Sequence, residues 1–150
     1  MASRICSTYG TTLAVIAFAM ASVGCSRGPM MVPVDGSVTL DDKPLSFGIV
    51  MLHPVKGQVA QGPIEPDGTF SLSTHHIGDG AQIGHYRVSV LCYQAHDPQK
   101  QPASSDGMDG FLLGQSLVPL HYTRATSSGL TVDVNPDGVR DLRLDLRSRQ

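Results

Sequence analysis

The chain contains no tryptophan, and phenylalanine and tyrosine together supply only 5% of its 150 residues. A carbohydrate-binding face made of stacked aromatic rings is therefore not expected, and any core must be built mainly from aliphatic side chains. Charged residues are also scarce at 16%, and the formal net charge is −2 with no basic patch. Proteins that bind nucleic acid usually concentrate lysine and arginine on one face, so nucleic acid is not expected as a partner.

No apolar stretch is long enough to cross a bilayer as a helix, which takes about 20 residues. Residues 13–21 form a nine-residue apolar run that follows Arg4. A basic start, an apolar run of about 7–15 residues and then small residues are typical of an export signal. The sequence therefore predicts a protein that acts outside the cytoplasm.

Two cleavage sites can be recognised after this run. Val23-Gly24-Cys25 matches the end of a bacterial lipoprotein signal, in which Cys25 becomes the lipidated first residue. Cleavage after Ala21 would instead release a soluble chain. We favour lipidation at Cys25, which predicts a signal peptide over residues 1–24 and a tether over residues 25–33. The expected location is then the periplasmic face or the cell surface, with the membrane bound through the lipid anchor.

The chain has only three cysteines, and Cys6 would leave with the signal peptide. Lipidation of Cys25 leaves Cys92 as a lone thiol, whereas cleavage after Ala21 would allow a Cys25–Cys92 disulfide. Cys92 lies in an apolar strand pattern, which predicts a small buried hydrophobic side chain. No partner base is identifiable for it, so we do not expect a nucleophile.

Apolar and polar residues alternate with the period of a β-strand through most of the remaining chain. Turn sequences separate these segments, as at residues 41–44, 66–68 and 135–138. Seven short strands at this spacing predict an all-β domain, a β-sandwich, over residues 34–147. The strands are expected at residues 34–40, 47–53, 58–64, 69–73, 86–92, 130–134 and 142–146. A long loop insertion, placed at residues 94–116, interrupts the pattern.

No catalytic set can be assembled from the sequence. There is no G-x-S-x-G elbow and no phosphate-binding glycine loop before a helix. His75, His76 and His85, with Asp79, are the best candidates for a metal site, but they lack the H-x-H or C-x-x-C spacing of strong sites. We therefore assign no catalytic, cofactor-binding or metal residue and expect no cofactor. Binding of a metal or small molecule by the His75/His76/His85 loop is the alternative function.

Taken in order, the strands and turns resemble a family: small exported lipoproteins, abundant in planctomycete-type bacteria, with a carboxypeptidase-regulatory-like or transthyretin-like domain. The matching segments span about residues 34–146. They are VDGSVTLDDKPL (34–45), PDGTFSL (66–72), GA (80–81) with GHYRVSV (84–90), VPLHY (118–122) and SSGLTVDV (127–134).

The resemblance implies a seven-stranded, Ig-like or prealbumin-like β-sandwich and implies little about activity. We expect no enzyme because the sequence offers no catalytic set. From the residues themselves we expect Gly36 and Gly68 to lie in bulges or turns, and Phe70 and Tyr86 to pack in the core. The hydroxyl of Tyr122 is expected to tie a loop. The function predicted is a non-enzymatic, lipid-anchored envelope domain that has a structural role or binds other envelope proteins or polymers.

Overall fold

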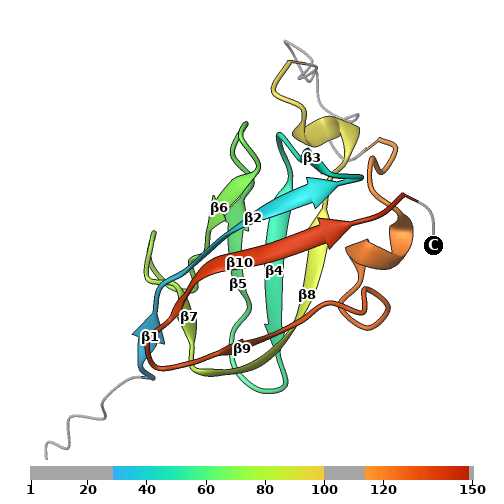
Figure 1. The fold of residues 1–150 in the computed structure, drawn as a ribbon. Helices are drawn as coiled ribbons and strands as arrows, with labels where there is room; N and C mark the ends of the chain where they lie inside the picture. The colour runs from blue at the N-terminus through green and yellow to red at the C-terminus, as the bar shows by residue number, and fades with distance from the viewer. Residues whose placement is uncertain (1–28, 100–113, 149–150) are drawn as a thin grey trace, which may run out of the picture.

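The computed structural model describes residues 29–99 and 114–148, and these residues form an all-β fold (Figure 1). Within these ranges two short 3₁₀ helices, η1 (Gln94–His96) and η3 (Leu120–Thr123), accompany ten strands. The strands are β1 (Met31–Val32), β2 (Val34–Leu40), β3 (Lys43–Pro44), β4 (Ile49–Pro54), β5 (Ala60–Pro63), β6 (Thr69–Ser71), β7 (Ala81–Gln82), β8 (Gly84–Leu91), β9 (Thr131–Val134) and β10 (Val139–Leu146). The prediction of an all-β protein is confirmed.

The strands form two four-stranded sheets and one small pair. The first sheet has the order β10-β2-β3, with β6 also paired to β2, and the second has the order β5-β4-β8-β9. β1 pairs with β7 at one end of the domain (Figure 1). All pairs are antiparallel except β2 with β10, which run side by side in the same direction. The first and last long strands of the domain are therefore neighbours.

The core draws its side chains from both sheets. Val38 of β2, Leu52 of β4, Val90 of β8 and Leu146 of β10 are all 0% exposed and belong to one hydrophobic cluster. The cluster is mostly aliphatic, as the shortage of aromatic residues predicts. Its buried aromatic side chains are Phe70, Tyr86 and Tyr122.

The predicted turns have the expected backbone geometry. Asp41 and Asp42 both have positive φ, at 51° and 64°, as in the two-residue turns that match the twist of a β-hairpin. Gly68 has φ 86° and donates its N–H to the Glu65 carbonyl at 2.8 Å. Gly138 has φ 79° and closes the turn after β9 in the same way. Each turn reverses the chain between two strands.

The last residues of the expected tether are part of the folded domain. Val32 lies in β1, opposite Ala81 of β7, and is only 5% exposed. An apolar side chain next to a hydrophobic core gains free energy by joining it, and this extends the folded unit before residue 34.

Several predictions fall on residues that the structure does not describe. The signal peptide, Cys25 and most of the 94–116 insertion lie outside the described residues. The two ends of the insertion are described, and they are joined by a bridge between Tyr93 and Ser116. No helix among residues 29–99 and 114–148 is long and apolar enough to span a membrane.

Candidate functional site

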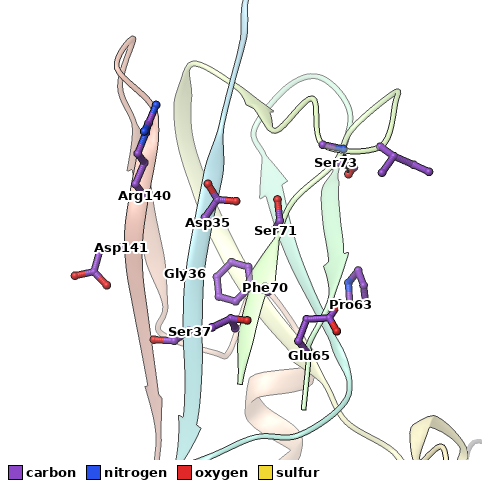
Figure 2. Close-up of a pocket in the computed structure, with 13 residues that line it drawn as sticks. Asp35, Gly36, Ser37, Pro63, Glu65, Phe70, Ser71, Ser73, Arg140 and Asp141 are labelled. Atoms are coloured by element: carbon purple, nitrogen blue, oxygen red, sulfur yellow. Dashed lines mark hydrogen bonds between the residues drawn. The ribbon is translucent and has the colours of Figure 1, made fainter. Parts of the chain in front are cut away.

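A hollow of about 700 Å³ lies where β2, β6 and β10 meet the segment that follows β6 (Figure 2). Phe70 of β6 lies near its centre, beside Gly36 of β2. Asp35, Glu65 and Asp141 line it together with Arg140. Three carboxylates and one guanidinium give this hollow an acidic character, so it suits neutral or cationic ligand groups better than anionic ones.

Residues 74–80 form a loop that is held by the carboxylate of Asp79. One Asp79 oxygen accepts the Thr74 N–H at 2.7 Å, and the other accepts the N–H groups of His75 and His76 at 2.9 Å each. The Thr74 hydroxyl donates to the Gly80 carbonyl at 2.7 Å. The bond from Thr74, followed by those from the two histidines, lowers the pKa of Asp79 to about 2.

This ordered loop presents Ile77 to solvent. The side chain of Ile77 is 103% exposed, although isoleucine is among the residue types most often buried. It lines the Phe70 hollow on one side and a second hollow of about 550 Å³ on the other. A fixed, projecting apolar side chain between two hollows is suited to contact with a partner molecule.

We predict that Asp79→Ala destabilises the domain in a pH-dependent manner. The folded-state pKa of Asp79 lies below its ordinary value of 3.8, so the carboxylate stabilises the fold fully above that value. This contribution is lost as the pH falls from about 4 to about 2. Urea denaturation at several pH values should show wild type more stable than the variant at neutral pH, with the two curves converging near pH 2.

Asp137→Ala is the matched control, because the Asp137 carboxylate receives no hydrogen bond within the described residues. It should change the free energy of unfolding little at any pH. A constant difference between Asp79→Ala and wild type across this pH range would contradict the assigned role of the carboxylate.

The three histidines considered for a metal site are not gathered in one place. His75 and His76 line the second hollow together with apolar side chains such as Val59 and Ile49. Among the described residues, no group of three or more histidine, cysteine, aspartate or glutamate side chains is arranged to hold a metal ion. Both oxygens of Asp79, the fourth candidate, already accept backbone N–H groups.

His85 lies on β8 and pairs with a different carboxylate. Its Nδ1 is 2.7 Å from Oδ1 of Asp133, the residue directly opposite it on β9. His85 lines a third hollow, of about 370 Å³, together with His53 and Arg87. Since both side chains of the His85–Asp133 pair are more than half exposed, the pair is screened by solvent and contributes little to stability.

The sequence did not reveal a pair between His53 of β4 and Ser89 of β8. Nε2 of His53 lies 2.8 Å from Oγ of Ser89, across the antiparallel β4–β8 pair. Ser89 is 2% exposed, and burial lowers the pKa of His53 below its ordinary value. His53 and Ser89 each lie on the face of their strand opposite the core residues Leu52 and Val90, but only the strand register brings these two side chains together.

Cys92 is a buried, free thiol, as expected. It is 0% exposed, and burial, with a smaller contribution from the Asp97 carboxylate, raises its pKa to about 11. Because the thiolate is the reactive form, this thiol has low reactivity at neutral pH.

The hydroxyl of Tyr122 ties a loop, as predicted. It accepts the backbone N–H of Arg147 at 3.2 Å and so links η3 to the end of β10. The guanidinium of Arg147 in turn donates two hydrogen bonds, at 2.6 and 2.9 Å, to the carboxylate of Asp42.

Comparison of the chain with protein-family models, with curated proteins and with solved structures gave no significant match.

Proposed function

We propose that this protein is an exported lipoprotein, anchored through Cys25, whose β-domain is a non-enzymatic structural or binding module of the cell envelope. The observation that carries this proposal is the export signal that ends at Cys25, directly before the folded domain. Only three residues, 26–28, lie between Cys25 and Pro29, where the described chain begins. Fully extended, the four residue steps from Cys25 to Pro29 span at most roughly 14 Å, so a lipid on Cys25 would hold the domain close to the membrane.

We also propose that the domain is a seven-stranded, prealbumin-like β-sandwich. Seven strands are longer than two residues, and each overlaps one of the seven predicted segments. Both four-stranded sheets supply side chains to one core, which is the arrangement that a sandwich requires.

The surface most suited to a protein or polymer partner is the 74–80 loop with the two hollows beside it. Ile77 offers an exposed apolar anchor, and the Asp79 carboxylate holds the loop in one conformation before binding. Such preorganisation lowers the entropy lost on association.

Binding of a small molecule by the histidine loop is the second candidate. The hollow beside His75 and His76 supports it, because the surface of that hollow is mostly apolar and polar side chains such as Gln61 and Thr74 are also among its lining. His85 does not line this hollow. Any such ligand would therefore contact His75 and His76 without His85.

Replacement of Cys25 by alanine tests the proposed anchor. In cells that process bacterial lipoproteins, we expect wild type in the membrane pellet and Cys25→Ala in the soluble fraction, because the acyl chains provide the membrane affinity. Cys92→Ala is the matched control and should stay in the pellet. A wild-type protein that is already soluble, or whose intact mass includes no fatty acyl chain, would refute the proposal.

A further inference from the structure

We propose that the end of the domain at which β1 pairs with β7 rests directly on the lipid surface. Met30, Val55 and Ile83 are the side chains that enter the interface, and Lys56 is placed to meet lipid phosphates. This inference rests on the proposed anchor at Cys25, and it adds the orientation that the domain takes at the membrane.

Three exposed apolar side chains are found at this end. Val55 is 88% exposed, Met30 is 66% exposed and Ile83 is 37% exposed. Val55 and Ile83 line the same shallow hollow, of about 190 Å³, and Lys56 lies there with them. Met30 directly precedes β1, and the neighbouring Met31 pairs with Gln82, the residue before Ile83.

The arrangement of the strands brings these residues to one end. Figure 1 shows the β4–β5 loop, the β7–β8 connection and β1 together at the lower end of the domain, where the described chain begins. η3, drawn in orange, lies away from this end, on the side where the chain terminates. Because the described chain begins at this lower end, a short link to a lipid at Cys25 would place this end, and not the η3 side, against the bilayer.

The backbone at this end is held in place before any membrane contact. The hydroxyl of Tyr86, a residue only 3% exposed, donates to the Gln82 carbonyl at 2.7 Å. The β1–β7 pairing holds the same residue from the other side. Ile83 is thus presented by a fixed segment and loses little conformational entropy on entering the interface.

The chemistry of this end fits the boundary between headgroups and acyl chains. Apolar side chains gain free energy when they leave water for that boundary, and a neighbouring lysine is attracted to phosphate groups. The anchor supplies the affinity for the membrane, and the patch selects which end of the domain faces it. His85 lies beside the patch and pairs with Asp133 at 2.7 Å.

The absence of tryptophan makes the test direct, because one substitution introduces a single fluorophore. Val55→Trp and Leu120→Trp would be made in the full lipidated protein and reconstituted into phosphatidylcholine vesicles with or without bromine on the acyl chains. Leu120 in η3 is the matched control, since it is 69% exposed and lies away from the proposed contact. Thermal melting of both variants checks that the domain remains folded.

We expect the fluorescence of Trp at position 55 to fall by about half or more in brominated vesicles, and that at position 120 to stay nearly unchanged. Equal quenching of the two, or quenching of neither while both proteins float with the vesicles, would overturn the orientation and leave the anchor intact. Failure of the wild-type protein to float with vesicles would overturn the anchor itself, and the orientation with it.

Discussion

Replacing Gly36 with alanine is expected to lower the free energy of unfolding by about 3 kcal/mol, which is a large fraction of the total stability of a marginally stable domain. A β-carbon at this position would lie 2.1 Å from the backbone oxygen of Leu142 and 2.8 Å from the ring of Phe70. The first contact is with backbone, which cannot rotate away as a side chain can. Thermal melting and urea denaturation of the purified domain would measure the loss.

The cause of this crowding is an irregularity in the pairing of β2 with β10. The register of the two strands shifts between Val139 and Leu142, and Leu142 then lies opposite Gly36. An irregularity of this kind locally bends and twists a strand, and here the backbone oxygen of Leu142 lies where a β-carbon of residue 36 would be. Glycine is needed at position 36 because it has no side chain to occupy the space.

Gly78→Ala is the control that separates crowding from backbone strain. Gly78 has φ 79°, so alanine would be strained there, but its β-carbon would meet no atom within 4 Å. Strain alone should lower the free energy of unfolding by about 1–2 kcal/mol. If Gly36→Ala were no more destabilising than Gly78→Ala, the close approach of β10 to β2 would be wrong.

Truncation of Leu146 to alanine is expected to lower the free energy of unfolding by about 3 kcal/mol. Leu146 is 0% exposed and ends β10, opposite Leu40 of β2. Its removal would leave a cavity in the shared core and weaken the contact between the first and last long strands. The loss would be measured as a lower urea midpoint with an unchanged denaturant slope.

Leu120→Ala serves as the matched control, because the same atoms are removed from a side chain that is 69% exposed. Its effect should lie within about 0.5 kcal/mol of wild type. Similar losses for the two leucine variants would show that β10 does not close the core as described.

The alternation of residues was sufficient to predict most strands and the faces that they bury. In β2, Val34 and Val38 are buried, and in β8 the buried side chains include Tyr86, Val88 and Val90, as expected. A period of two residues places neighbouring side chains on opposite faces of any strand, whichever strand it pairs with. The turns were predicted equally well, because Gly68 and Gly138 adopt a positive φ and each lies in a local Pro-Asp-Gly sequence that is typical of a tight turn.

The candidate site was predicted less well. The sequence suggested that His75, His76 and His85 could share a ligand, whereas His85 pairs with Asp133 and the other two line a separate hollow. The pair formed by His53 and Ser89 was not predicted, because the two residues lie 36 positions apart. Alternation tells which face of a strand a side chain occupies, but not which strand lies next to it.

The sequence by itself determined the all-β class, the turns, the aliphatic core and the expectation of a lipid at Cys25, because each depends on residues close together in the chain. Tertiary structure alone decided that β10 runs parallel to β2, that the Leu142 backbone meets Gly36, and that Val55 and Ile83 share one end of the domain. These arrangements depend on how two sheets pack around a common core. Such packing brings together residues that are far apart in the sequence, and the sequence around each residue does not indicate which distant residue it will contact.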